Sequence, residues 1–256
     1  MKKEDVLKLD SMPILGESYP RGPYRFINRE YLVITYETDP EVLRAVIPEP
    51  LIPENNTVSY EYMKMPDSSG FGDYSESGVV IPCTLNGEKV NFTLMMYLND
   101  EPPTTGGREI WGFPKKFGQP ELQVKRDTLV GTLRYDGDLV SMGTMTYKHE
   151  NLLTDPKHKP AENMMSVEER LGKKQVNLKL IPSVTGGKPD VCQLISYQMN
   201  EISVKGAWAG QARLHLVPHV NAPVADLPVR KVLGGAHFIA DITLPYGTVE
   251  YDYLKA

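Results

Sequence analysis

Short alternating segments separated by turns are the strongest constraint on the fold of this chain. Turn sequences such as LNGE (85–88) and YDGD (135–138) separate these segments at hairpin distances. The 21 glycines and 21 prolines among 256 residues exceed the average combined share of about 12% and favour many turns. Strand-type residues recur at 30–38, 57–65, 90–98, 139–149, 176–183 and 236–244.

Helical signals are confined to two segments. Residues 39–48 have Asp39 at an N-cap position and Pro40 at the first helical position. Residues 161–172 end on Gly172, as a helix often does. We therefore predict a mainly β fold with few helices, in which antiparallel sheets curl into a closed or cone-shaped β-barrel around an internal active-site cavity. Because no break in composition divides residues 1–256, we expect a single domain.

Charge and cysteine usage narrow the class of protein. A net charge of −5 argues against a nucleic-acid partner, because binding phosphates needs a basic surface. Cys83 and Cys192 lie far apart, which indicates reduced thiols and a cytoplasmic protein. Pro218 interrupts the pair His215 and His219, so we expect no zinc site there. No apolar run approaches the roughly 18 residues of a membrane helix, so we expect no membrane partner. The net charge leaves a small molecule or another protein as the expected partner.

Two adjacent lysines lie in an unusually apolar stretch, EIWGFPKKFGQP. An ordinary lysine pair is exposed and extends its stems over neighbouring apolar surface. Here Lys115 and Lys116 follow Trp111 and Phe113 and precede Phe117. The chemical alternative is that one amine is kept neutral, so that it attacks a carbonyl group and forms a Schiff base.

Several separated strings, in the same order along almost the whole chain, resemble the acetoacetate decarboxylase family. The resemblance implies that Lys115 is the Schiff-base lysine, with Lys116 as its companion, and that Arg29, Glu61 and Glu76 are polar site residues. It implies decarboxylation of acetoacetate to acetone and carbon dioxide without metal or cofactor, and a large homo-oligomer such as a dodecamer. The strings lie at 19–39, 60–78, 95–120 and 240–255.

This chemistry requires a neutral amine at physiological pH. Burial shifts the pKa of a lysine by up to about 3–5 units, and an ammonium about 4 Å away has an effect of about three units. Adjacent side chains diverge on a strand, so Lys116 need not face Lys115. We therefore expect burial to be the main cause of a lowered Lys115 pKa. The residues expected to provide it are Trp111, Phe113, Phe117 and Met95 or Met96.

The remaining site residues have different expected roles. Glu76, in a glycine-containing turn sequence, is a candidate for proton transfer. Glu61 alternates with Tyr60 and Tyr62 on a strand, so it points either to solvent or into a polar cavity. Its two candidate roles are to accept a hydrogen bond or to hold Lys116 as an ion pair. We expect Arg29 to orient substrate or the glutamates, because a tight grip on the departing carboxylate would stabilise the ground state.

Two alternative functions remain open from the sequence. The Schiff base also suits aldol-type condensation or dehydration of a keto acid. A non-catalytic barrel that binds a small acid is the alternative of a different class.

Overall fold

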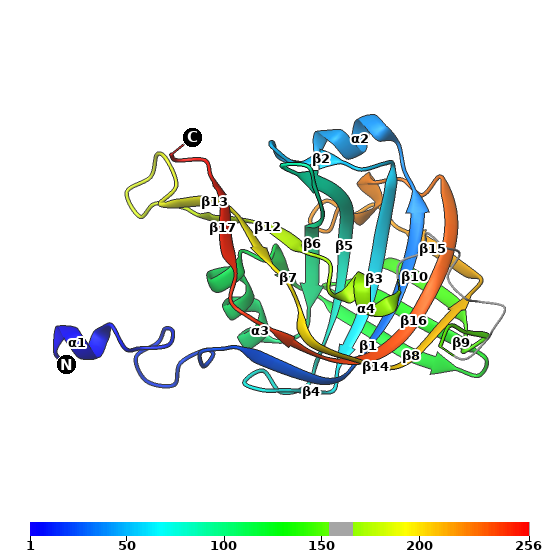
Figure 1. The fold of residues 1–256 in the computed structure, drawn as a ribbon, viewed down its shortest axis with the longest axis horizontal. Coiled ribbons are helices and arrows are strands. Elements are labelled where there is room, and N and C mark those ends of the chain that lie inside the picture. Colours follow the sequence, from blue (N-terminus) through cyan, green and yellow to red (C-terminus); the bar gives the residue numbers. More distant parts are fainter. Residues whose placement is uncertain (154–165, 256) are drawn as a thin grey trace.

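The computed structural model describes residues 1–153 and 166–255, which form two sheets (Figure 1). The larger sheet has 13 strands in the order β11-β14-β16-β1-β3-β5-β6-β12-β13-β17, with β2, β4 and β7 beside this path. Its strands are β1 (Tyr24–Glu37), β2 (Ile52–Pro53), β3 (Thr57–Met65), β4 (Asp67–Ser68), β5 (Tyr74–Leu85), β6 (Glu88–Leu98), β7 (Lys115–Phe117), β11 (Glu150–Asn151), β12 (Gln175–Ile181), β13 (Val191–Tyr197), β14 (Asn200–Gly210), β16 (Lys231–Leu244) and β17 (Thr248–Asp252). The smaller sheet, in the order β15-β10-β9-β8, contains β8 (Gln119–Lys125), β9 (Thr128–Tyr135), β10 (Asp138–Thr146) and β15 (Ala212–Leu216).

Helices are few and short, which confirms the prediction of a mainly β fold. They are α1 (Lys3–Val6), α2 (Pro40–Ala45), α3 (Glu101–Gly106), the π-helix η1 (Gly107–Trp111), α4 (Val167–Leu171) and the 3-10 helix η3 (Val224–Asp226). Within residues 1–153 and 166–255, no helix has the length and apolar character needed to cross a bilayer.

The two predicted helical segments correspond to α2 and α4. Asp39 precedes α2 as expected, but its carboxylate accepts hydrogen bonds from Arg230 and does not cap the helix. Residues 161–165 of the second segment lie outside the described residues, and α4 begins at Val167 and is followed by Gly172.

The large sheet is strongly curved, but the predicted closed barrel is not confirmed. Among the described residues, the hydrogen-bonded order ends on β11 at one side and on β17 at the other, and these two strands do not pair. The sheet stays open because β12 pairs with β6 at only two positions. Beyond these positions, β12, β13 and β17 extend away from the rest of the sheet (Figure 1). The curvature follows β1 and β16, whose long pairing contains register shifts.

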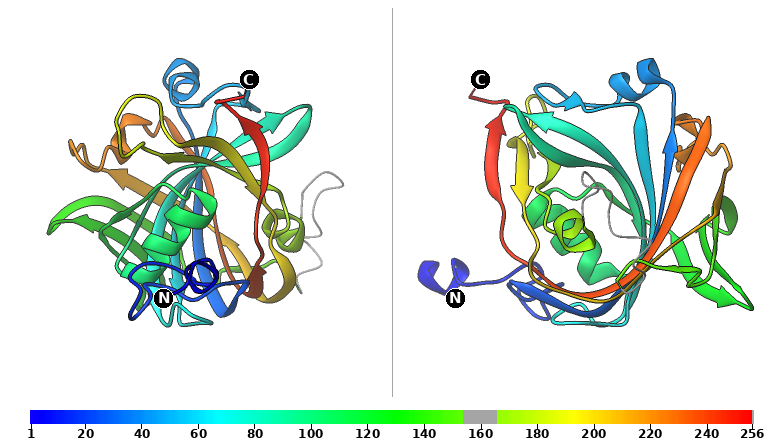
Figure 2. Two further views of the ribbon diagram at one scale, coloured as in Figure 1. Left: turned by 90° about the vertical axis from the view of Figure 1, so that its left-hand side faces the viewer. Right: turned by 45° about the vertical axis from the view of Figure 1, so that its right-hand side comes forward.

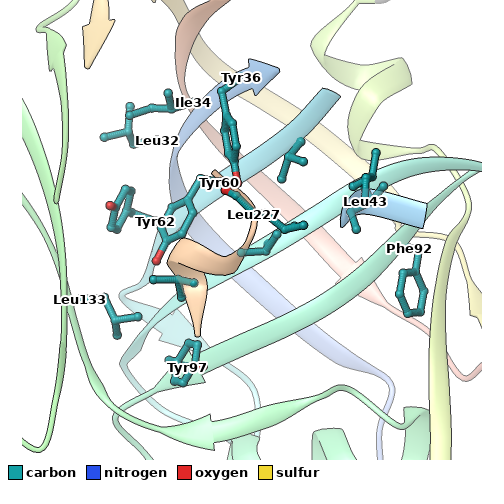
Figure 3. Close-up of a cluster of buried hydrophobic side chains, with 14 of the residues drawn as sticks. Leu32, Ile34, Tyr36, Leu43, Tyr60, Tyr62, Phe92, Tyr97, Leu133 and Leu227 are labelled. Carbon is teal, nitrogen blue, oxygen red and sulfur yellow. Dashed lines mark hydrogen bonds between the residues drawn. The ribbon is translucent and has the colours of Figure 1, made fainter. Parts of the chain in front are cut away.

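Strand β3 separates two environments because its side chains alternate. Tyr60 and Tyr62 point toward the smaller sheet, where their hydroxyls donate to Ser141 Oγ over 2.7 and 3.0 Å. A Cβ at Gly131 or Gly143 would lie within 2.6 Å of the Tyr62 ring, so these glycines let the two sheets approach closely. Leu32, Ile34 and Leu133 belong to the same buried cluster (Figure 3). The opposite face of β3 is thereby left for the concave side of the large sheet.

The helices α3 and α4 lie inside the curve of the large sheet (Figure 2). Helix α3 and η1 form the crossover between β6 and β7, which pair in parallel. A parallel pair needs such a crossover, because a tight hairpin connects only antiparallel strands. The crossover brings the start of β7 to the concave side of the sheet.

Candidate active site

Lys115 is the first residue of β7 and lies opposite Met96 of β6. The turn before β7 depends on Gly112, whose φ is +72° and whose Cβ would lie 2.4 Å from the backbone of Lys179. No other residue fits there without displacing β12. The turn directs Lys115 inward, where its side chain is only 6% exposed.

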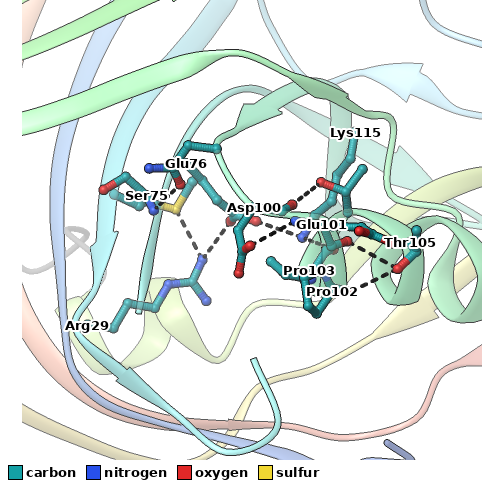
Figure 4. Close-up of polar contacts among 12 residues, drawn as sticks. Arg29, Ser75, Glu76, Asp100, Glu101, Pro102, Pro103, Thr105 and Lys115 are labelled. Atoms are coloured by element: carbon teal, nitrogen blue, oxygen red, sulfur yellow. Dashed lines mark hydrogen bonds and ion pairs between the residues drawn. The ribbon is translucent and has the colours of Figure 1, made fainter. Parts of the chain in front are cut away.

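The ammonium end of Lys115 has two polar contacts in an otherwise apolar surrounding (Figure 4). Its Nζ lies 2.6 Å from Glu76 Oε1 and donates a hydrogen bond of 3.0 Å to the carbonyl oxygen of Pro103. The ring centroid of Phe113 is 5.0 Å away. Burial lowers the pKa of Lys115, and Arg29 adds to this, although Glu76 opposes it. The amine is therefore more readily neutral than that of an ordinary lysine.

Gly107, at the start of η1, leaves room for the Lys115 side chain. A Cβ built on Gly107 would lie 2.9 Å from Lys115 Cδ, 3.0 Å from Cε and 3.1 Å from Nζ. The first separation would force a shift, and the other two are tighter than most carbon contacts. Gly107 thus leaves the space that the end of the Lys115 side chain occupies.

Glu76 links Lys115 to Arg29. It lies within β5, so the prediction of a turn at Glu76 was wrong. Its side chain is buried, and its Oε2 is 3.7 Å from an Nη of Arg29. The guanidinium of Arg29 also lies 3.1 Å from Met63 Sδ and 4.8 Å from the ring centroid of Tyr31. Burial lowers the pKa of Arg29, but neighbouring tyrosine and glutamate side chains raise this pKa by more, so the guanidinium stays charged. These neighbours are Tyr31, Glu76, Tyr74 and Glu61.

Glu61 lies on the concave face of β3, between the two tyrosines that point to the opposite side. It lines the same cavity as Glu76 and retains some exposed surface there. Burial raises the pKa of Glu61 to about 7, while Arg29 and Arg170 lower it and Glu76 raises it further. Of the two predicted orientations, the polar cavity is the observed one.

The cavity that joins these groups has a volume of about 220 Å³. Four of the five predicted site residues line it, namely Arg29, Glu61, Glu76 and Lys115. The rest of its wall near Lys115 is mainly apolar or aromatic and includes Phe26, Tyr31, Met63, Phe71, Tyr74, Met96, Trp111, Phe113, Tyr197 and Phe238. The site therefore has room for a small organic molecule beside a single buried amine.

Lys116 lies apart from the other four residues. Its side chain is exposed and donates a hydrogen bond to the Asn221 carbonyl, with the Tyr135 ring centroid 5.1 Å from its Nζ. The divergence predicted for the two lysines is therefore observed, and Lys116 is not among the groups that shift the Lys115 pKa.

The predicted apolar wall is correct in part. Trp111, Phe113 and Met96 are buried and line the cavity. Phe117 is 56% exposed, so its inclusion was wrong. Met95 packs against the cluster between the two sheets, because neighbouring residues of β6 face opposite sides.

Sequence reasoning missed three contributors to the site. The Pro103 carbonyl and Gly107 gave no residue-type signal, since any residue has a carbonyl and the chain contains 21 glycines. Arg170 lines the cavity from α4, far from Lys115 in sequence. Across residues 1–153 and 166–255, no group of three or more His, Cys, Asp or Glu side chains is arranged to hold a metal ion.

Comparison with known proteins gives a consistent result. Residues 11–254 match the family described as Acetoacetate decarboxylase (ADC). A curated acetoacetate decarboxylase from Bordetella avium is 52% identical over 246 residues, which cover 95% of each chain. A solved structure titled Structural Studies of Acetoacetate Decarboxylase has a TM-score of 0.92 at 43% identity and covers 99% of this chain and 100% of its own. The acetoacetate decarboxylase structure from Legionella pneumophila has a TM-score of 0.87 at 46% identity, covering 95% and 93% of the two chains.

Proposed function

The chain belongs to the acetoacetate decarboxylase family, and we infer from this that it is a carboxy-lyase that converts acetoacetate to acetone and carbon dioxide. The observation that carries the mechanism is the buried Lys115 Nζ beside Glu76, in a cavity of suitable size for a small keto acid. Both acetoacetate and the proposed intermediates are small enough for this cavity.

We propose that the neutral amine of Lys115 attacks the ketone carbon of acetoacetate. The carbinolamine then loses water to give an iminium ion that joins the substrate to Nζ. Cleavage of the bond to the carboxylate sends its electron pair into the iminium, which releases carbon dioxide and leaves a neutral enamine. Protonation of the enamine carbon and addition of water return acetone and free Lys115.

Glu76 is proposed as the group that moves protons during these steps. Its Oε1 is 2.6 Å from Nζ, within reach of the proton that leaves the amine and of the water that leaves the carbinolamine. Arg29 and Glu61 are proposed to orient and tune Glu76, because Arg29 contacts it and both lie in the same cavity.

Lys116 is proposed as a positioning residue for β7. Alternation along the strand sends its side chain to the outer surface, where its bond to the Asn221 carbonyl ties β7 to the segment after β15. This supports a role through the placement of Lys115 and not through its charge.

Borohydride reduction in the presence of acetoacetate, followed by peptide mass mapping, tests the proposal. We expect a covalent label on Lys115 together with carbon dioxide release, and neither in Lys115→Met. Lys116→Arg is the matched control, because it removes the adjacent amine, keeps a donor for the Asn221 carbonyl and should retain the label. Binding without label or gas would instead support a carrier, and label without gas would support condensation chemistry.

Some broader properties are also proposals. A single domain is supported by the buried cluster that residues of both sheets share. A large homo-oligomer is supported by exposed apolar side chains on the projecting segments, such as Leu15 and Val184, and light scattering would measure it. The free thiols of Cys83 and Cys192 support a cytoplasmic location.

A further inference from the structure

The cavity extends from Lys115 along the concave face of β5. Alternate residues of this strand line it from Glu76 through Gly78 and Val80 to Pro82. The six residue steps from Glu76 to Pro82 span about 20 Å along the strand at about 3.3 Å per residue. Pro82 pairs with Asn91, and Asn91 in turn pairs with Gln175 at the start of β12. The cavity therefore has a second end, remote from the amine.

Polar and cationic side chains surround this second end. Asn91 and Gln175 lie there because they pair beside Pro82, and the cationic side chains of Arg170 and Lys173 also line the cavity, in contrast to the aromatic wall around Lys115. Arg170 is exposed to solvent although it lines the cavity, so it stands at the mouth, whereas the Lys173 side chain is only 13% exposed.

Helix α4 holds Arg170 at the mouth. The hydroxyl of Ser166 accepts a 3.1 Å hydrogen bond from the Glu169 backbone, and the Glu169 carboxylate accepts a 2.7 Å bond from the Ser166 backbone. Leu171 is buried and lines the cavity, which fixes the helix against the large sheet. The position of α4 inside the curve of the sheet is visible in Figure 2.

The two cations act on different carboxylates among the described residues. Lys173 Nζ lies 3.6 Å from Glu54 Oε2, and Glu54 also pairs with Lys89. Arg170 acts on Glu61 inside the cavity, where its charge lowers the pKa of that carboxyl. The positive charge of Arg170 therefore acts on a carboxyl group inside the cavity.

We propose that Arg170, with Lys173 as the secondary charge, draws the carboxylate of a small β-keto acid into the cavity. This inference rests on the proposed function. An anion that enters a cavity containing Glu61 and Glu76 meets like charge, and a cation at the mouth offsets that repulsion. Because Arg170 is exposed whereas Lys115 is buried, it attracts the anion without gripping the carboxylate that must leave as neutral carbon dioxide.

The proposal predicts a specific kinetic pattern for Arg170→Gln. The KM for acetoacetate should rise about fivefold, with a much smaller change in kcat, since an exposed ion pair is worth up to roughly 1 kcal/mol. The fall of kcat/KM with added salt should also become shallower. Arg170→Lys should restore both properties. Arg134→Gln, which makes the same change of charge on β9 and away from the cavity, is the matched control.

Acetone provides a ligand without a carboxylate. Addition of Lys115 to acetone, loss of water and loss of a methyl proton give the same enamine, and deuteron uptake from D₂O then labels the methyl group on release. Arg170→Gln should affect this exchange much less than it affects acetoacetate decarboxylation. An equal effect on both, or an unchanged KM and salt dependence, would overturn the role of Arg170. Failure of the wild-type protein to decarboxylate acetoacetate would instead overturn the proposed function.

Discussion

Glu76 Oε1 lies 2.6 Å from Lys115 Nζ, and both side chains are almost completely buried. Burial lowers the pKa of the Lys115 amine, and the Glu76 carboxylate raises it. The same carboxylate that makes the amine less readily neutral is therefore the group placed to accept its proton. The sheet provides this contact because β7 and β5 both flank β6.

Glu76→Gln should lower kcat by about 10²–10³-fold, because it removes the group placed for proton transfer. It should also move the acidic limb of the pH–rate profile to lower pH, since the amide no longer raises the Lys115 pKa. Steady-state rates between pH 4 and 9 measure both effects. Glu121→Gln, on the exposed side of β8, is the control, and a limb that moved to higher pH would contradict the assigned sign.

Gly107→Ala should reduce activity much more than it reduces stability. The added methyl would lie 2.9–3.1 Å from three atoms of Lys115, so the flexible end of the lysine moves away from Glu76. Since a displacement of about 1 Å at a reacting group costs on the order of 10²-fold in rate, the smaller shift required here should lower kcat by roughly two- to tenfold. Gly234→Ala on β16 is the matched control, because its methyl meets no atom within 4 Å. A fully active Gly107→Ala protein would show that the amine tolerates another position.

Local sequence patterns predicted the parts of the fold that depend on neighbouring residues. The alternation around Glu61 predicts both β3, observed at Thr57–Met65, and the opposite orientation of Glu61 relative to Tyr60 and Tyr62. The divergence of Lys115 and Lys116 follows from the same geometry.

Features that depend on pairing between distant segments were not predictable in this way. Among the described residues the order of the sheet ends on β11 and β17, and nothing in β6 or β12 alone indicates that these two strands pair at only two positions. The exposure of Phe117 and the approach of Arg170 to the cavity likewise depend on the placement of whole elements. Residue type alone identified the lysine, but not its Pro103 acceptor or the space left by Gly107.

Glu61 should make stability depend on pH in a defined direction. Burial raises its folded pKa to about 7 from an ordinary value near 4.5, so between these values the folded state binds more protons than the unfolded state. The contribution of Glu61 to the free energy of unfolding is therefore full below about pH 4.5 and is lost as the pH rises through 7, by up to about 3 kcal/mol. Urea unfolding at pH 5 and pH 8 should show a smaller loss in Glu61→Gln than in the wild type. An identical pH dependence in the two proteins would rule out the raised pKa.

Arg29→Gln should reverse the direction of the shift expected for Glu76→Gln. The guanidinium lowers the Lys115 pKa, so its removal raises that pKa and moves the acidic limb of the pH–rate profile to higher pH. The value of kcat should fall by roughly tenfold or more, because Glu76 loses the cation 3.7 Å from its Oε2 and is no longer oriented. Arg29→Lys separates the two effects, since it keeps the charge but not the planar guanidinium. It should restore the position of the limb but only part of kcat. A rise in KM alone, with kcat unchanged, would instead assign Arg29 to substrate binding.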